Sequence, residues 1–212
     1  IGDGNAIELR YGSNSWIDNN TIEQYGNDAS QNFGIGVYFS DWNRIHNNTV
    51  SDSEVTGILL GDDAEFNYVT GNSLTRTEFP AIRVLYDNNY IAHNIVSETG
   101  WIGIVVDGDR NEIIDNTLVD GESSGINVYG SNNQFTGNNF SGGSDFPIQA
   151  TGTWNVFTDN VVDAAGEDAA VLVTGSNNQF SGNQLTNGDI GFLVSGDWNE
   201  FEENSVSSFS EV

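Results

Sequence analysis

Asparagine and apolar residues recur along the chain in the order Asn-x-apolar-x-x-Asn-x-apolar. The pattern occurs nine times, with Ser15 in place of the first Asn in the first copy. Successive copies are 21 to 28 residues apart, and four consecutive steps are 22 residues each. The second Asn of the pattern stands at Asn20, Asn48, Asn72, Asn94, Asn116, Asn138, Asn160, Asn183 and Asn204. A period of this length indicates a solenoid of stacked repeats.

A second block of apolar residues precedes each copy of this pattern. It reads small-apolar-x-apolar, as in residues 57–60 and 103–106, and we place it at residues 36–39 in the second copy. Alternation with period two is typical of strands, and β-branched and aromatic residues occupy many of the apolar positions. Gly, Asn and Asp interrupt every copy, which excludes a long helix. Each repeat is therefore predicted to hold three short strands whose alternating apolar residues point inward.

A repeat of about 22 residues cannot bury its own apolar side chains, so the repeats must stack. The sequence predicts one all-β domain over residues 1–212, a right-handed single-stranded parallel β-helix of about nine coils with three short strands per coil. Residues 1–4 read as the middle of a coil, so we expect a fragment of a longer chain whose N-terminal cap is missing.

Two ladders of Asn are predicted inside the turns of this solenoid. Asn tolerates a left-handed backbone, and its amide can bond to the same amide one coil away. In the core, an apolar column that begins with Ile17 and Ile45 changes to Phe in the last four coils. The C-terminal half should therefore contain a stack of aromatic rings, formed by Phe135, Phe157, Phe180 and Phe201.

Two segments carry a resemblance to a known group of proteins. Asn43-Arg-Ile-His-Asn-Asn-Thr-Val50 and Gly125-Ile-Asn-Val-Tyr-Gly-Ser-Asn-Asn133 resemble the parallel β-helix repeats of the NosD type. That superfamily of carbohydrate-binding and sugar-hydrolase-like proteins also includes pectate lyases and alginate epimerases. The resemblance covers the whole chain but concerns core and ladder positions, so it implies the fold rather than one function. It also implies that a site would lie on one outward strand face.

Charge and composition indicate the source and ionic environment of this solenoid and exclude some partners. The chain has 31 acidic residues against 5 basic ones, all of them Arg, and a formal net charge of −26. This composition resembles that of salt-in halophiles, so we expect a halophilic archaeon as the source and an acidic surface surrounded by hydrated cations. Nucleic acid is excluded as a partner because phosphate binding needs clustered Lys and Arg. The absence of Cys excludes thiolate metal sites, and no apolar run is long enough to insert this segment into a membrane.

Candidate chemistry lies on the outward face of the first strand in the middle coils. Arg83, Asp107, Asn127, Tyr129 and Gln149 should cluster there within a few coil spacings. Asp107 and Tyr129 should be vertical neighbours, with Arg83 one coil earlier on the diagonal. These three are the candidate catalytic residues, because such a set suits acid–base chemistry on a sugar acid. The alternative is that these are ordinary polar residues on a solvent-facing sheet without a catalytic role. The Asp-Pro-His-Asp motif of alginate epimerases, which the resemblance would suggest, is absent.

Aromatic side chains provide candidate positions for binding a sugar. Trp42, Trp154 and Trp198 each precede the first Asn of their coil, and if they point outward they form a strip for stacking on sugar faces. Packing against the turn backbone is the alternative for these rings. On the first-strand face, Tyr38 joins Asn127 and Gln149 as a candidate substrate-binding residue.

Acidic side chains provide a candidate metal site. Asp62, Asp63 and Glu65, and separately Asp107 with Asp109, carry the oxygen ligands that Ca²⁺ prefers. No calcium-binding repeat accompanies them, so solvated monovalent counter-ions are the alternative, and the fold requires no cofactor.

Three classes of function remain open from the sequence. The leading hypothesis is a non-enzymatic extracellular or cell-surface module, structural or adhesive, that binds a polysaccharide or a surface glycan. The second is a polysaccharide-active enzyme, a uronate lyase, epimerase or glycoside hydrolase, with its site on the first-strand face. The third is a viral spike or trimeric fibre, in which exposed Leu59, Leu172 and Leu193 would be contact points. The sequence does not decide the oligomeric state.

Overall fold

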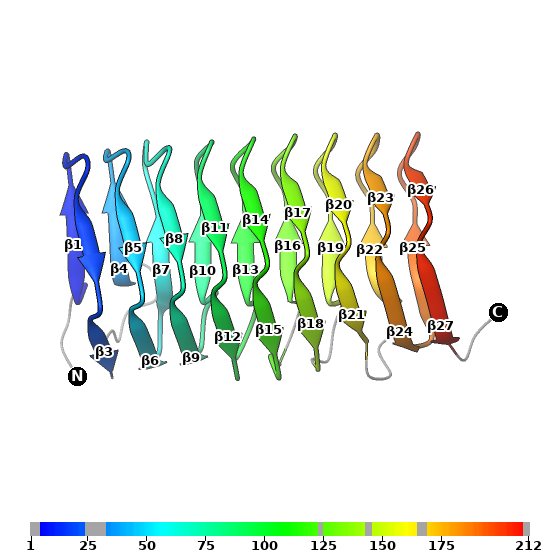
Figure 1. Cartoon of the computed structure of the whole chain (residues 1–212), viewed down its shortest axis with the longest axis horizontal. Helices are drawn as coiled ribbons and strands as arrows, with labels where there is room; N and C mark the ends of the chain where they lie inside the picture. Colours follow the sequence, from blue (N-terminus) through cyan, green and yellow to red (C-terminus); the bar gives the residue numbers. More distant parts are fainter. Residues whose placement is uncertain (1–4, 24–32, 123–124, 143–145, 165–168, 210–212) are drawn as a thin grey trace.

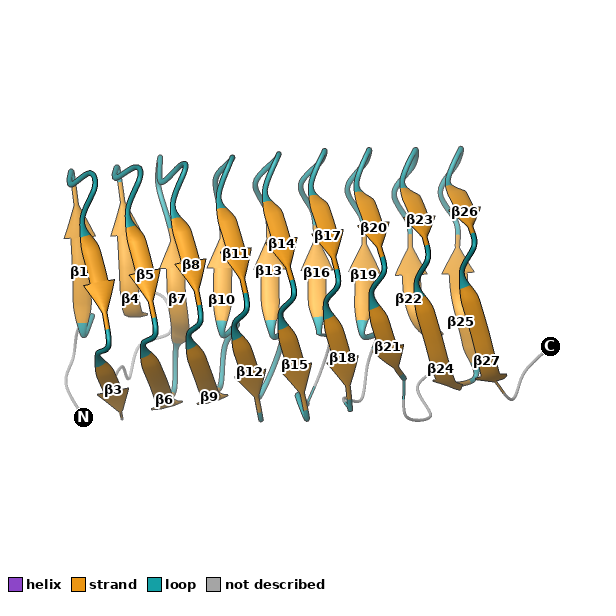
Figure 2. Ribbon diagram, viewed as in Figure 1, coloured by secondary structure: helices purple, strands orange, loops and turns teal. Residues whose placement is uncertain are grey.

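Three parallel sheets run the length of the molecule in the computed structural model, and each coil contributes one strand to each sheet (Figures 1 and 2). The structure describes residues 5–23, 33–122, 125–142, 146–164 and 169–209; residues 1–4, which the sequence suggests lie within a coil, are outside this part. Every strand pairing is parallel and joins one coil to the next, as in β10 to β13. The predicted right-handed parallel β-helix is confirmed. Within the described residues, no helix is long and apolar enough to cross a membrane.

Each sheet contains nine short strands. The first sheet consists of β1 (Ile7–Arg10), β4 (Phe33–Tyr38), β7 (Thr56–Leu60), β10 (Ile82–Val84), β13 (Ile104–Val106), β16 (Ile126–Val128), β19 (Ile148–Ala150), β22 (Ala169–Val173) and β25 (Ile190–Val194). The second consists of β2 (Trp16–Asp18), β5 (Arg44–His46), β8 (Tyr68–Thr70), β11 (Tyr90–Ala92), β14 (Glu112–Ile114), β17 (Gln134–Thr136), β20 (Val156–Thr158), β23 (Gln179–Ser181) and β26 (Glu200–Glu202). The third consists of β3 (Thr21–Glu23), β6 (Thr49–Ser53), β9 (Ser73–Thr77), β12 (Ile95–Ser97), β15 (Thr117–Val119), β18 (Asn139–Ser141), β21 (Val161–Asp163), β24 (Gln184–Gly188) and β27 (Ser205–Phe209).

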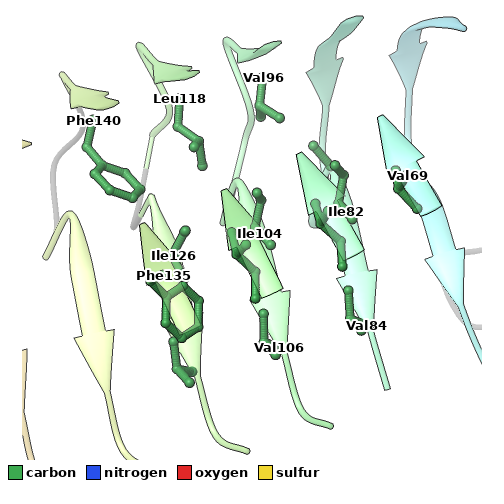
Figure 3. Close-up of a cluster of buried hydrophobic side chains, with 14 of the residues drawn as sticks. Val69, Ile82, Val84, Val96, Ile104, Val106, Leu118, Ile126, Phe135 and Phe140 are labelled. Atoms are coloured by element: carbon green, nitrogen blue, oxygen red, sulfur yellow. The ribbon is translucent and has the colours of Figure 1, made fainter. Parts of the chain in front are cut away.

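Apolar side chains from all three sheets meet along the axis of the solenoid. Figure 3 shows this core in the middle coils. There Ile82, Ile104 and Ile126 occupy the same position in successive strands of the first sheet and form one column. In the second sheet, Phe135, Phe157 and Phe180 stack with ring centroids 4.6 Å apart and nearly parallel planes. Phe201 continues the stack at 5.1 Å from Phe180. The predicted aromatic column is therefore present.

The two Asn ladders hold the turns together in different ways. In the ladder that runs from Asn20 to Asn204, each Nδ2 donates to the Oδ1 of the Asn in the next coil at 2.9–3.0 Å. In the ladder that runs from Asn43 to Asn199, each backbone N–H donates to the next Oδ1, but amide-to-amide bonds join only the first three residues. From Asn133 onward, Nδ2 donates instead to a glycine carbonyl of the preceding coil.

The left-handed backbone of the turns lies one residue earlier than predicted. The ladder Asn residues do not have positive φ angles; the residue before each of them does. In the turn between the first two sheets these residues have φ of 55–62° and are Asn14, Trp42, Phe66, Asn88, Arg110, Asn132, Trp154, Asn177 and Trp198. The ladder Asn then turns its amide inward, where it satisfies buried backbone groups that would otherwise lack partners. The chain therefore places aromatic side chains at a backbone conformation that usually favours Gly or Asn.

A column of glycine marks the five C-terminal coils. The carbonyl oxygen of the preceding coil lies so close that an added Cβ would come within 1.8–2.1 Å of it at Gly108, Gly130, Gly152, Gly175 and Gly196. No side chain larger than hydrogen fits there without moving the backbone. The turn after the first sheet is therefore held at one separation from coil to coil.

The predicted register of the second coil is wrong by two residues. In the structure Ile35 and Val37 point inward and are fully buried, whereas Phe39 is exposed and has a positive φ. Tyr38 therefore aligns with Arg10 rather than with Glu8. Leu59, predicted to be exposed, is only 4% exposed and aligns with Gly36, over which the Tyr38 ring lies. The proposed fibre contact thus loses Leu59; Leu193 is exposed and Leu172 half-buried.

Candidate functional site

An open hollow of about 280 Å³ lies on the outer face of the first sheet, over β10 and β13. Its floor and rim combine apolar, aromatic and charged side chains. They are Pro80, Arg83, Trp101, Ile102, Val105, Asp107 and Tyr129. A concave surface with a few polar groups among apolar ones is typical of a small-ligand site.

Arg83 and Asp107 form an ion pair across two coils at this hollow. The register aligns Arg83 with Val105, so Asp107 lies on the diagonal, as the sequence predicts. The Nε–H of Arg83 donates to Oδ2 of Asp107 at 3.0 Å. Both side chains remain partly exposed. Val105 lies between them on the strand face and is almost completely buried, so the pair stands on an apolar base.

Tyr129 lines the hollow one coil after Asp107, and two other candidate residues, Asn127 and Gln149, lie on nearby strands of the same sheet. Tyr129 follows β16 at the position that Asp107 occupies after β13, and it is 47% exposed. Asn127 is only 5% exposed, and its Nδ2 lies 3.4 Å from the Tyr129 hydroxyl. Its Oδ1 is buried without a hydrogen-bond partner in the described structure. Gln149 aligns with Asn127 one coil later, outside the hollow itself.

Trp101 is the main member of this hollow that the sequence did not suggest. It is 45% exposed and packs edge-to-face on Phe79, with ring centroids 6.2 Å apart. Both rings lie in loops that close successive coils, and the repeat pattern does not include those loops. The signal that was available is a Trp three residues before β13, at the end of the loop that leads into the first sheet. Trp101 and Tyr129 give the hollow two exposed ring surfaces.

Tyr38 lies outside this hollow and is largely covered. It is 8% exposed, and the Arg10 guanidinium lies 4.5 Å from the centre of its ring. Its ring occupies space over Gly36 and Gly61, neither of which has a Cβ. Burial, together with the charge of Glu8, raises the pKa of Tyr38 to about 12. The second-coil register error explains why the sequence placed Tyr38 on the ligand-facing column.

The tryptophans of the turn column are exposed, but they do not form one strip. Trp42 is 50% exposed and stacks on Phe66 with centroids 4.7 Å apart and planes within 5°. Trp154 and Trp198 are 60% and 86% exposed. Asn and Arg residues occupy the positions between Phe66 and Trp154, and Asn177 separates Trp154 from Trp198. Only Trp42 and Phe66 therefore present a joined pair of rings.

The acidic residues considered for Ca²⁺ do not converge. Across the described ranges, no group of three or more His, Asp or Glu side chains is arranged to hold a metal ion. This includes Asp62, Asp63 and Glu65. Asp109 has a structural role, because its Oδ1 accepts the backbone N–H of Ser131 at 2.7 Å. Asp107 is paired with Arg83 instead of facing Asp109.

Comparison with known proteins identifies the architecture. The model of the family described as right-handed β-helix region matches residues 2–140 and 80–210. No curated protein matches the sequence.

Among solved structures, the A-module of the mannuronan C-5 epimerase AlgE4 of Azotobacter vinelandii aligns with a TM-score of 0.56 and 13% identity. The alignment covers 85% of this chain and 63% of that one. XylC, solved in complex with xylose, aligns with a TM-score of 0.54 and 12% identity, over 74% of this chain and 31% of XylC. The chain thus spans less than two thirds of both proteins, and the likeness concerns the fold alone.

Proposed function

The chain belongs to the right-handed β-helix family, and from this we propose that it is a non-enzymatic module that binds a polysaccharide on the outer face of its first sheet. We place it outside the cell or on the cell surface, where a rigid solenoid would present this face to a glycan. Stacking of coils keeps that face straight and holds its side chains at fixed spacing.

The hollow around Arg83 carries this proposal. Sugars present an apolar ring face edged by hydroxyl groups, and aromatic rings pack against such faces while polar groups bond the edges. Trp101 and Tyr129 supply exposed rings, and Arg83 with Asp107 supplies donors and acceptors between them. The same strip of surface therefore offers both kinds of contact that a sugar needs.

The geometry of Asp107 favours binding over turnover. A general base needs an oxygen that faces the proton it removes. Oδ2 of Asp107 already accepts the Nε–H of Arg83, so the pair suits recognition of hydroxyl groups. The Tyr129 hydroxyl lies 3.4 Å from Nδ2 of Asn127, a neutral amide.

Glycan-array binding and titration calorimetry test the proposal. Wild-type protein should bind at least one polysaccharide class, and Trp101→Ala should weaken that binding by about fivefold or more through the lost ring contact. Trp198→Ala is the matched control, because Trp198 is 86% exposed and lies in another column. Binding that is unaffected by Trp101→Ala would contradict this site.

Two further measurements separate this proposal from its alternatives. Incubation with uronate polymers should release neither unsaturated nor reducing ends. If it does, and the release disappears in Asp107→Ala, the enzyme hypothesis replaces ours. Light scattering should not show a trimer, which is the state that a fibre segment requires.

We also propose that the acidic surface is an adaptation to high salt. With a net charge of −26, like charges repel across the whole surface unless cations screen them. The melting temperature should therefore fall as KCl is lowered from molar to millimolar concentration. Cooperative melting at an unchanged temperature would contradict salt adaptation.

A further inference from the structure

The second sheet carries a separate aromatic surface at its N-terminal end. The first outward position of its strands holds Trp16, Arg44, Tyr68 and Tyr90 in four successive coils. Trp16 is 65% exposed and Tyr68 38% exposed. Strands β5, β8 and β11 follow one another in Figure 1, so these side chains form a single row along the solenoid. Candidate residues from the sequence did not include any of this row.

Arg44 in this row has rings on both sides but, among the described residues, no acidic partner. Its guanidinium carbon lies 4.9 Å from the ring centre of Trp16 and 5.9 Å from that of Tyr68. The other four arginines each lie within 4.0 Å of a carboxylate, whereas no described carboxylate lies that close to Arg44. An exposed cation without an acidic partner is unexpected on a surface of net charge −26. Within the described ranges, no acidic side chain accepts a hydrogen bond from its five N–H donors.

The row borders a hollow of about 340 Å³ that has two further polar groups. Trp16, Arg44, His46, Tyr68 and Thr70 line it. Nδ1 of His46 lies 3.0 Å from the backbone oxygen and 2.9 Å from Oγ1 of Thr70. In the tautomer with hydrogen on Nδ1, both Thr70 oxygens can accept it, and Nε2 is left to bond a ligand.

A second hollow of about 310 Å³ continues the first along the solenoid. Phe66, Asn67, Tyr68, Asn88, Asn89, Tyr90, Arg110 and Glu112 line it. Tyr68 belongs to both hollows, and Tyr90 lies 5.8 Å from it, ring centre to ring centre. The Trp42–Phe66 stack stands at the turn beside this row. The surface therefore suits a ligand several units long rather than a single small molecule.

We propose that this second-sheet surface is a binding site for an anionic saccharide chain, with the acidic group of one sugar on Arg44 and sugar rings on Trp16 and Tyr68. A guanidinium can form two parallel hydrogen bonds to a carboxylate or a sulfate, and flanking rings hold it in place for them. One carboxylate, Asp18, lies on the same sheet next to His46 in the preceding coil. Its Oδ2 accepts a hydrogen bond from Nδ2 of Asn19. The site shares no lining residue with the first-sheet hollow, so the two binding proposals are tested by different variants.

Titration calorimetry on the intact chain tests this site with three probes: oligogalacturonate, a sulfated galactan oligosaccharide and a neutral dextran oligosaccharide. KCl is kept at the lowest concentration at which circular dichroism shows folded protein, because salt screens the contact. Wild-type protein should bind an anionic probe, and Arg44→Ala should weaken that binding at least about tenfold. Tighter binding of the uronate assigns a carboxylate to Arg44, and tighter binding of the galactan assigns a sulfate.

Arg76→Ala is the matched control, because it also removes one positive charge but lies on the third sheet, paired with Asp52. It should bind the anionic probe like wild type. Trp16→Ala should weaken binding several-fold through the lost ring contact. Equal loss in Arg44→Ala and Arg76→Ala, equal binding of neutral dextran, or no binding of either anionic probe would overturn the proposal. A melting curve of Arg44→Ala that matches wild type confirms that the variant is folded.

Discussion

The two halves of the second sheet place their aromatic rings on opposite sides. In the first five coils the core position holds aliphatic residues such as Ile45 and Ile91, and rings such as Trp16 and Tyr68 lie outside. In the last four coils Phe rings fill the core, and the outward neighbours are Gln134, Val156, Gln179 and Glu200. One strand pattern therefore serves ligand contact at one end and internal packing at the other.

This difference shows what the repeat leaves free. The backbone, the ladders and the inward direction of alternate residues are the same in both halves. What changes is which of two adjacent positions receives the large ring, since neighbouring residues of a strand face opposite sides. Substitutions on either side of the sheet should then have opposite profiles: large effects on stability in the C-terminal half and large effects on binding in the N-terminal half.

The strongest test of this division is Phe157→Ala. Phe157 is 1% exposed and has a ring stacked on each side at 4.6 Å. Its loss should lower the free energy of unfolding by about 3–5 kcal/mol, because transfer and cavity terms add. Urea unfolding followed by circular dichroism measures it. Tyr68→Ala, an exposed ring of the other half, should cost less than about 1 kcal/mol. Similar costs for the two variants would remove the distinction between the halves.

A smaller effect should be common to both halves, and it comes from the continuous ladder. Asn72→Ala and Asn160→Ala each remove an amide that donates to a backbone oxygen and to the next ladder Asn. Each should lower the free energy of unfolding by about 2 kcal/mol, because buried partners lose their bonds. The same urea titrations measure both. Agreement within about 0.5 kcal/mol is expected; a much lower cost at Asn72 would mean that the halves differ in their scaffold as well.

A Tyr38 variant tests whether an aromatic side chain on the outer side of the N-terminal half can also contribute to stability. Its pKa is raised to about 12, from 10.0, by burial and the charge of Glu8. The stability linked to a raised pKa is present below pH 10 and is lost as the pH rises toward 12. Between about pH 9 and pH 11 the wild-type protein should lose roughly 1 kcal/mol relative to Tyr38→Phe. Phenolate absorbance should show one tyrosine that titrates late in wild type. Identical titration curves in the two proteins would show that Tyr38 is not held in this way.

The smallest predicted effects concern the exposed tryptophans of the turn column. Asn already occupies the same left-handed position at Asn88 and Asn132, so Trp→Asn leaves the backbone unstrained. Trp42→Asn should cost about 0.5–1 kcal/mol through the lost stack with Phe66. Trp198→Asn should change stability by less than about 0.5 kcal/mol, since Trp198 is 86% exposed. Thermal melting of both variants measures this, and a larger loss at Trp198 would reverse the expected order.

The sequence was sufficient for the fold because the fold is a repeat. The spacing of Asn and apolar residues predicts the coils, the ladders and the Phe stack, and the diagonal of Arg83 and Asp107 follows from the same register. The second coil was misplaced because a shift of two residues keeps every side chain on the same side of the strand, so alternation does not detect it. Gly34-Ile35-Gly36-Val37 fits the small-apolar-x-apolar block as well as residues 36–39 do, and in the structure this register places the Tyr38 ring over Gly36 and Gly61.

The ligand surfaces were harder to predict for a different reason. Trp101 lies in a loop that closes a coil, outside the repeated pattern. Arg44 lies within the pattern, but its importance depends on the absence of an acidic partner, and partners are set by side-chain contacts between coils. Positions that vary from coil to coil show no periodic signal. They become visible only when the coils are stacked and neighbours on the surface can be compared.

The glycine column of the C-terminal coils has a consequence for how such a protein lengthens. At Gly130 and Gly152 the backbone of one coil lies directly against that of the next, and both make the same contact. A segment of 22 residues that begins after Gly130 and ends with a glycine would repeat this backbone contact above and below. Duplication or deletion of a whole coil in this region would therefore leave the glycine contact in place between the remaining coils. The C-terminal half can act as an adjustable spacer, while the surfaces around Arg44 and Arg83 stay tied to the coils before it.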